Sequence, residues 1–300
     1  MDNPTIIITG PTATGKTTLA VQLAQEYKGE IISADSRQVF RRMDIGTGKD
    51  LHEYGEIPYH LIDILEPDAE FSVSDFQTKA LRCIKTIGQR QKLPIICGGT
   101  GHYIKALIEN YQFPIPKTDL EVTNQLEKKD RAFLYQKIKD LGIWDHHHWE
   151  NDSKRRMVRA IEKARLVPKE NQISQDESSN YTVFYTHLDR QIIRDRIKIR
   201  LDQRLAEGMV DEVQALIASG VSESRLERFG LEYKWILFYL TDKLSHEEMQ
   251  GKLYTEICRY AKRQMTFIRY LEKSGHHLIP VQNYKDLKAA IQNQNILGKI

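Results

Sequence analysis

The chain has 300 residues, a net charge of +3, 40% hydrophobic residues and 28% charged residues. These values are typical of a soluble globular protein with one large domain, or with a core and an insertion. Because no apolar run approaches the roughly 20 residues of a membrane helix, and the first strand leaves no room for a signal peptide, we expect a cytoplasmic protein with no membrane contact. The small net charge does not by itself indicate nucleic-acid binding.

A strand, a glycine-rich loop and a helix are expected in that order between residues 5 and 24. The loop, GPTATGKT at 10–17, matches G-x-x-x-x-G-K-[ST], whose backbone N–H groups and lysine bind phosphates. Lys16 supplies a full positive charge, and Thr17 offers a hydroxyl to a magnesium ion (Mg²⁺). The expected polyphosphate-binding residues are Gly10, Thr12, Ala13, Thr14, Gly15, Lys16, Thr17 and Thr18.

A second strand is expected at 30–34, and Asp35 follows it. We expect this strand to neighbour the strand of the phosphate loop, so that the carboxylate lies at the carboxyl edge of a parallel sheet, where such sheets bind ligands. The alternative is that Asp35 caps the next helix, and the two roles are compatible. Residues 43–49 form a glycine-containing loop with a lysine, which by itself is a weak signal.

Further strands are expected at 60–64, 93–97 and 183–188, and helices at 73–90, with Ser72 as its cap, and at 103–108. Residues 98–101 (GGTG) are a second place where backbone N–H groups approach a ligand closely. The pattern predicts an α/β fold: a parallel sheet around a phosphate loop, flanked by helices.

Residues 113–116 (FPIP) mark a change in composition, after which residues 119–141 are charged and helical. We therefore expect a catalytic core at 1–114 and 152–300, and a mainly helical insertion at 115–151. Three adjacent histidines, His146 to His148, cannot all face one ion from a regular element, so we favour a loop anchored by Trp144 and Trp149 over a metal site.

Positive charges gather on three predicted helices. The first, at 154–165, contains Arg155, Arg156 and Arg159. On the second, Arg196, Arg200 and Arg204 share one face and form a candidate anion site, unless Asp195 and Asp202 make it an ordinary solvated face. The third, a C-terminal block at 259–270, alternates basic and aromatic residues, which suits a looped RNA; it contains Arg259, Tyr260, Lys262, Arg263, Phe267, Arg269 and Tyr270.

In combination, the motifs resemble those of the tRNA dimethylallyltransferases, also called tRNA isopentenyltransferases, of the bacterial type. The matching pieces occur in order over most of the chain: GPTATGKT (10–17), DSRQVF with MDIGTGK (35–49), HLIDILEP (60–67), GGTGHYIKAL (98–107), KRRMVRAIE (154–162), RIKIRLDQRL (196–205) and AKRQMTFIR (261–269). The phosphate loop alone is generic; the 35–49 stretch together with AKRQ is specific.

The resemblance implies transfer of a dimethylallyl group from dimethylallyl diphosphate to the N6 amine of an adenine beside the anticodon, at position 37 of tRNA. It implies that Lys16 and Thr17 hold the leaving diphosphate with magnesium, that Asp35 accepts the amine's proton, and that an arginine, Arg200 in preference to Arg196, clamps the diphosphate. The implied tRNA contacts are Asp35, Ser36, Arg37, Gln38, Thr100, Arg155, Arg156, Arg159, Lys262 and Arg263. We expect the protein to act as a monomer.

The sequence departs from the family pattern at three positions, where Phe40, His102 and Phe267 replace the usual Tyr, an apolar residue and Trp; residues 228–234 match only a variant of the pattern. Three alternatives stay open. A small-molecule kinase would share the loop and the carboxylate but gives no reason for the basic helices. An isopentenyltransferase acting on free adenine nucleotides would not need the basic C-terminal block. A non-catalytic RNA-binding module would bind tRNA without forming product.

Overall fold

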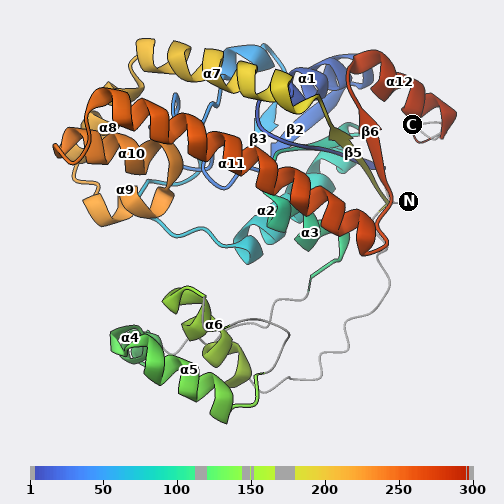
Figure 1. The fold of residues 1–300 in the computed structure, drawn as a ribbon. Helices are drawn as coiled ribbons and strands as arrows, with labels where there is room; N and C mark the ends of the chain where they lie inside the picture. The colour runs from blue at the N-terminus through green and yellow to red at the C-terminus, as the bar shows by residue number, and fades with distance from the viewer. Residues whose placement is uncertain are drawn as a thin grey trace. The chain divides into compact units, whose positions relative to one another are not determined.

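The computed structural model describes residues 4–111, 120–143, 149, 152–165, 180–294 and 296 (Figure 1). Contacts divide the chain into a larger unit, residues 1–111 and 179–300, and a smaller unit, residues 112–178. Among the described residues, no helix is both long enough and apolar enough to cross a membrane.

A six-stranded, fully parallel sheet forms the centre of the larger unit. Its order is β3-β2-β4-β1-β5-β6, and its strands are β1 (Thr5–Thr9), β2 (Gly29–Ser33), β3 (Tyr59–His60), β4 (Leu93–Cys97), β5 (Tyr181–Thr186) and β6 (Leu278–Val281). The parallel sheet confirms the predicted fold class. One detail was wrong: β4 lies between β1 and β2, so the strand that leads to Asp35 is not next to the strand of the phosphate loop.

The third predicted strand is shorter than expected. It was predicted at 60–64, but β3 ends at His60 because Leu61 and Asp63 have positive φ angles of 63° and 54°. An isolated parallel bridge between Phe40 and Leu65 follows. The chain therefore leaves the sheet at this point and enters a set of loops beside the carboxyl edge.

Alternate residues of the buried strands supply two cores. Ile6 and Ile8 of β1 pack on one face with α1 (Lys16–Tyr27) and α12 (Tyr284–Asn293), whereas Ile7 packs on the other face. That second face is covered by α2 (Val73–Gln89), α3 (Gly101–Ile108) and the end of α11 (His246–Lys273). Ser72 caps α2 as predicted, in a capping box with Asp75.

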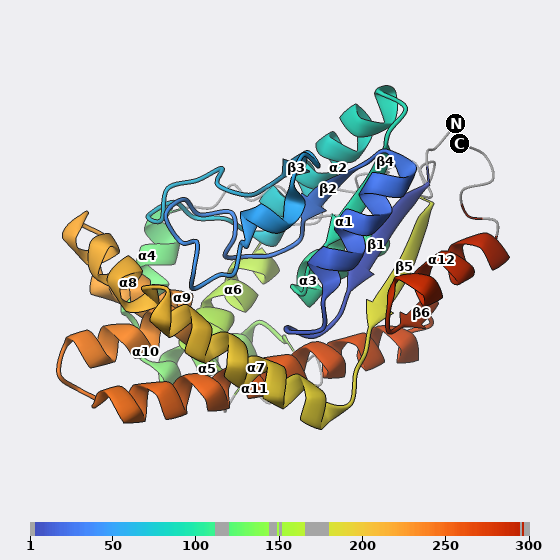
Figure 2. The same cartoon turned by 90° about the horizontal axis from the view of Figure 1, so that it is seen from above.

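A helical layer extends from the carboxyl edge of the sheet. It consists of α7 (Arg190–Ala206), α8 (Met209–Ala218), α9 (Glu223–Phe229), α10 (Leu231–Leu240) and α11, with the short 3-10 helix η1 (Leu51–Tyr54) nearby. In Figure 2, α7 crosses α11, and the two helices are in contact. Residues 39–45 pack into the same apolar core as this layer. The carboxyl edge thus faces helices from the C-terminal third of the chain.

The smaller unit is helical, with α4 (Leu120–Lys128), α5 (Arg131–Asp140) and α6 (Lys154–Arg165) around its own core. Leu134, Ile138 and Ile161 are almost fully buried there. Because α6 packs with α5, the unit continues beyond residue 151, where the sequence placed its end. Trp149 is buried and donates a hydrogen bond from Nε1 to the carbonyl of Ile143 (3.2 Å). Trp144 and the His146–His148 run lie outside the described residues.

Candidate active site

A cavity of about 670 Å³ lies at the carboxyl edge of the sheet in the larger unit. Its wall combines the phosphate loop, residues 35–38 after β2, residues 46–48, Gly98 and Gly99 after β4, and parts of α7, α10 and α11. The carboxyl edge of the sheet, where the sequence predicted ligand binding, therefore borders a cavity. Its helical wall comes from elements that are remote in sequence.

Two residues of the phosphate loop shape it without lining the cavity. Thr14 is buried and hydrogen-bonds the carbonyl of Pro11 (2.7 Å) and the hydroxyl of Thr186 at the end of β5 (2.5 Å). Gly10 has a φ of 142° and lies so close to Thr186 that a Cβ there would collide with it. The other predicted loop residues line the cavity: Thr12, Ala13, Gly15, Lys16, Thr17 and Thr18.

Lys16 and Arg200 bring two positive charges to the loop. The ammonium of Lys16 donates to the carbonyl of Pro11 (2.6 Å), and Arg200 hydrogen-bonds the hydroxyl of Thr12. Burial lowers the pKa of Lys16 to about 8 and that of Arg200 to about 10, and in each case a neighbouring arginine, Arg200 or Arg204, adds to the lowering. Both groups are charged at neutral pH but poorly solvated, so a bound anion would stabilise them.

The three arginines that were predicted to share one helical face do not all reach the cavity. Arg196 is exposed, whereas Arg200 and Arg204 line the cavity. Arg204 is almost buried and forms an ion pair with Asp50 (3.0 Å). The alternative of an ordinary solvated face therefore holds for the first arginine of the row and fails for the other two.

Asp35 lines the cavity and also organises the turn that follows it. Its Oδ1 accepts hydrogen bonds from the backbone N–H groups of Arg37 (2.8 Å) and Gln38 (3.3 Å). The N–H of Ser36 donates to the hydroxyl of Thr100 (3.1 Å), which joins this turn to the loop after β4. Residues 36–50 contain no helix, so the alternative that Asp35 caps a helix is wrong; its carboxylate instead holds a turn and lines the cavity.

The side chains of Arg37 and Gln38 are engaged by the protein itself. The Nε of Arg37 donates to the carbonyl of Phe229 (3.0 Å), and its guanidinium lies 5.3 Å from the centre of that ring. The amide of Gln38 accepts from the hydroxyl of Ser33 (2.8 Å) and donates to the carbonyl of Gly48 (3.0 Å). These contacts fix the rotamers of both side chains at the cavity wall.

Gln264 on α11 was missed as a site residue, although the AKRQ block contains it. Its Oε1 accepts from the backbone N–H of Thr12 (2.7 Å), and its Nε2 donates to the carbonyl of Gly99 (3.0 Å). One amide therefore ties the phosphate loop to the loop after β4. No sequence pattern indicated this contact, because Gln264 and Thr12 are 252 positions apart.

Glu232, also missed, and Tyr260, predicted only as part of the basic and aromatic C-terminal block, line the same cavity. Burial raises the pKa of the Glu232 carboxyl, against the opposing influence of Arg204 and Arg200. Burial also raises the pKa of Tyr260, and the negative charge of Asp35 adds to that effect. The variant stretch at 228–234 was the only signal for Glu232, and it identified no single residue.

The predicted basic contacts fall in two places. Arg263 lines the main cavity and, with Lys262, a second cavity of about 560 Å³ along α11. Arg155, Arg156 and Arg159 lie on α6 in the smaller unit and are exposed there. Arg156 pairs with Asp152 (2.9 Å), and Arg159 pairs with Glu162 (3.3 Å).

The cavity contains oxygen ligands suited to a hard cation. The hydroxyl of Thr17 and the carboxylates of Asp35, Asp50, Glu53 and Glu232 line it. Within the described ranges, however, no three His, Cys, Asp or Glu side chains converge as a metal site. This donor set fits an ion such as Mg²⁺, which takes one or two protein oxygens together with substrate phosphates.

Comparisons with known proteins agree over nearly the whole chain. The family model described as IPP transferase matches residues 38–270, and one described as Isopentenyl transferase matches residues 4–56. A curated protein of Syntrophus aciditrophicus, tRNA dimethylallyltransferase 1, is 42% identical over 295 residues, which cover 96% of this chain and 97% of that protein.

Two solved structures have the same fold. The tRNA isopentenylpyrophosphate transferase of Bacillus halodurans superposes with a TM-score of 0.73 at 32% identity, covering 100% of this chain and 98% of that one. A eukaryotic dimethylallyltransferase acting on tRNA gives a TM-score of 0.82 at 25% identity, covering 99% of this chain and 80% of that one.

Proposed function

This chain belongs to the family of tRNA dimethylallyltransferases, or IPP transferases, and on that premise we propose its reaction and the residues that perform it. It is an enzyme that transfers a dimethylallyl group from dimethylallyl diphosphate to the N6 amine of an adenine beside the anticodon of tRNA. The observation that carries the proposal is that one cavity joins the phosphate loop to the carboxylate of Asp35.

The donor half of the site binds the diphosphate. Lys16, Arg200 and the N–H groups at the start of α1 surround the space where its oxygens would lie. As the bond between the allylic carbon and oxygen breaks, its electron pair leaves with the diphosphate, whose negative charge increases. Positive groups that are already in place stabilise that charge without reorganising, which is the main catalytic contribution expected of them.

The acceptor half orients the amine. An exocyclic amine conjugated to a purine is a poor nucleophile, and a carboxylate that takes its proton as the carbon–nitrogen bond forms contributes about 10²–10⁴ in rate. Asp35 is suited to this role because two backbone N–H groups hold its Oδ1. The hydroxyl of Thr100 accepts from the backbone N–H of Ser36, the residue after Asp35, and we assign Thr100 to the region where the allyl group and the adenine would meet.

Magnesium completes the donor half. Thr17 would hold Mg²⁺ together with the diphosphate oxygens, and the ion would add positive charge where the leaving group gains negative charge. Lys16 has a separate role as a positive charge, and its ammonium is held at the loop by the hydrogen bond that it donates to the carbonyl of Pro11.

The basic helices account for tRNA as the acceptor. Lys262 and Arg263 lie beside the cavity on α11, and Arg155, Arg156 and Arg159 give the smaller unit an exposed basic helix. Phosphate contacts of this kind position an RNA, whereas the cavity selects the base. An anticodon loop makes extrusion of the adenine inexpensive, because its bases are already unpaired.

One assay distinguishes this function from its alternatives. Purified protein with magnesium is incubated with labelled dimethylallyl diphosphate and either unmodified tRNA or free AMP; in a parallel reaction, labelled ATP is offered with a small alcohol. Label in the N6 position of a tRNA adenine is the expected result. Label in AMP would favour an enzyme acting on free nucleotides, phosphorylation of the alcohol would favour a kinase, and tRNA binding without product would favour a binding module.

A further inference from the structure

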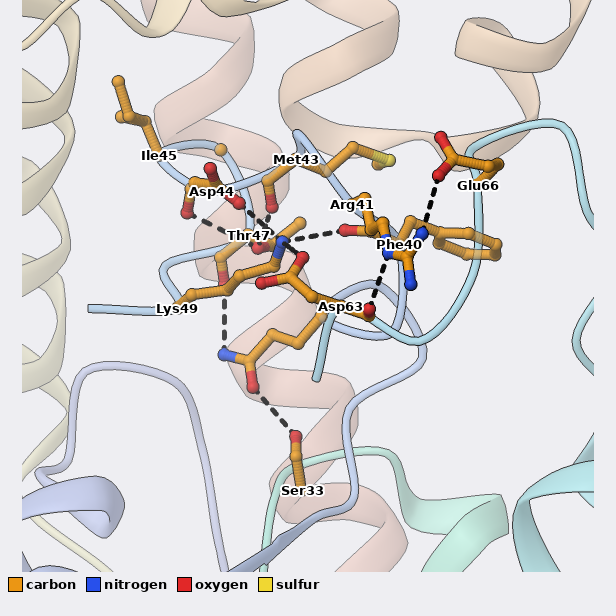
Figure 3. Close-up of polar contacts among 12 residues, drawn as sticks. Ser33, Phe40, Arg41, Met43, Asp44, Ile45, Thr47, Lys49, Asp63 and Glu66 are labelled. Atoms are coloured by element: carbon orange, nitrogen blue, oxygen red, sulfur yellow. Dashed lines mark hydrogen bonds and ion pairs between the residues drawn. The ribbon is translucent and has the colours of Figure 1, made fainter. Parts of the chain in front are cut away.

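Lys49 has a buried ammonium that the mechanism above does not use. Its side chain is 1% exposed, and its Nζ donates to the carbonyl of Phe40 (2.8 Å), to Oδ1 of Asp44 (2.5 Å) and to Oδ1 of Asp63 (Figure 3). An ammonium has three donors, so these three acceptors satisfy it completely. Because they come from three points along the chain, Lys49 fixes residues 40–49 against the segment at Asp63.

The two chain neighbours of Lys49, Gly48 and Asp50, together contact both halves of the cavity. On one side, the carbonyl of Gly48 accepts from the side chain of Gln38, whose backbone N–H donates to Asp35. On the other side, Asp50 pairs with Arg204, and a Cβ at Gly48 would collide with the same guanidinium. Lys49 therefore anchors a loop whose residues contact both the acceptor half and the donor half of the cavity.

A second anchor holds the same loop from α8. The carboxylate of Glu212 accepts from three consecutive backbone N–H groups, those of Asp44 (2.7 Å), Ile45 (2.7 Å) and Gly46 (3.1 Å). It also accepts from the hydroxyl of Tyr233 (2.8 Å). With this anchor intact, loss of the Lys49 ammonium is expected to loosen the loop without unfolding it.

We propose that Lys49 is a positioning residue, which acts through residues 44–50 to hold Asp35 and Arg204 in the relative geometry that transfer requires. It contacts neither substrate. The inference rests on the proposed function, which assigns Asp35 to the acceptor and Arg200 to the diphosphate; Arg204 lies one turn from Arg200 on α7 and lines the same cavity. A displacement of about 1 Å in such a geometry costs about 10²-fold in rate, so the effect should be large.

Three variants test the proposal: Lys49→Met, Asp63→Asn and the two combined. Lys49→Met leaves Asp63, whose side chain is 34% exposed, without its cation, which lowers stability by itself; Asp44, the other carboxylate, is 58% exposed and stays solvated. The double variant removes that unpaired charge, so its unfolding midpoint should return to near the wild-type value. We expect kcat for tRNA prenylation to stay about 10- to 100-fold low in both Lys49 variants, while the Kd for tRNA changes by less than about threefold.

The double variant distinguishes a positioning role of Lys49 from a role in stability alone. Recovery of kcat together with the unfolding midpoint would overturn the proposal, and so would a Lys49→Met enzyme with kcat within about twofold of wild type. Lys85→Met, at an exposed lysine of α2, is the matched control and should leave kcat unchanged.

Hydrogen exchange gives a readout that does not depend on activity. Amides in 38–48 should exchange at least about tenfold faster in Lys49→Met and in the double variant than in wild type, whereas amides of β1 should not change. Unchanged exchange at 38–48 would overturn the proposal whatever the activity. If wild type fails to prenylate tRNA although 38–48 loosens as expected, the proposed function fails and the assignment of Lys49 as the anchor of this loop stands.

Discussion

Arg200 of α7 hydrogen-bonds the hydroxyl of Thr12, so a helix from the C-terminal part of the chain directly contacts the phosphate loop. This places a guanidinium against the loop that we propose binds the diphosphate. Arg196, one turn earlier on the same helix, is exposed and lies outside the lining of the cavity. The two arginines therefore form a natural pair of test and control.

Replacing Arg200 by Ala should raise the KM for dimethylallyl diphosphate by about 10- to 100-fold, as expected for loss of a charged hydrogen bond worth about 1.5–3 kcal/mol. The Kd for tRNA should be nearly unchanged. Arg196→Ala should alter both values by less than about twofold, because its charge is solvated. Steady-state kinetics with labelled diphosphate measure the effect, and equal behaviour of the two variants would exclude the proposed clamp.

Replacing Asp35 by Asn should reduce prenylation by at least about 10²-fold, because Asn cannot take the proton of the amine. The Asn side chain keeps an oxygen that can accept from the N–H groups of Arg37 and Gln38, so the turn should persist. Product is measured by mass, and tRNA binding by filter assay. A loss of binding as large as the loss of product would contradict the assignment of Asp35 as the base.

The sequence predicted the local parts of this site because short-range chemistry determines them. A glycine loop with a lysine, and a serine cap three residues before Asp75, function through contacts within a few residues. The position of β4 between β1 and β2 depends on pairing over the whole sheet, and no local pattern encodes it. The strand that leads to Asp35 was therefore predicted with the wrong neighbour, even though the carboxylate of Asp35 does line the cavity.

The residues that were missed depend on tertiary contacts that no short motif encodes. Gln264 reaches Thr12 across 252 positions, and Lys49 resembles a surface lysine until its loop folds around it. The departure at Phe40 does have a physical reason in the structure. Its ring is buried, lies 5.2 Å from the ring of Phe229 and lies under the guanidinium of Arg225 (5.4 Å). Such a site favours an aromatic ring and has no need of a hydroxyl.

Titration of Lys16 should limit activity at alkaline pH. Burial lowers its pKa to about 8, so the charged form that binds diphosphate predominates below that value and is lost as the pH rises through it. The ratio kcat/KM for dimethylallyl diphosphate should therefore decline above pH 8, since this ratio reports the free enzyme. In Lys16→Arg, whatever its activity, the decline should disappear, because arginine stays charged. A wild-type profile that is flat to pH 10 would argue against this role.

Gln264→Leu should lower kcat by about tenfold or more, because it unties the phosphate loop from Gly99 and leaves the N–H of Thr12 without its acceptor. The same change should lower the free energy of unfolding by about 1–3 kcal/mol. Gln264→Glu is the matched variant: it keeps an acceptor for Thr12 but places a carboxylate oxygen against the carbonyl of Gly99. If both variants kept wild-type kcat, the bridge would have no part in the reaction.

The basic face of α6 should contribute to tRNA binding through phosphate contacts. Arg155 and Arg159 are exposed and one turn apart, so their joint replacement by Ala should weaken binding and lower the slope of log K against log salt by about 1–2. Arg82 and Lys85, exposed on α2, provide a control pair with the same loss of charge. Binding is measured from 50 to 300 mM salt, about the range over which counterion release is resolved. An unaltered slope in the α6 variant would mean that this face contacts only solvent. The same change in the α2 control would mean that the effect comes from lost charge and not from this face.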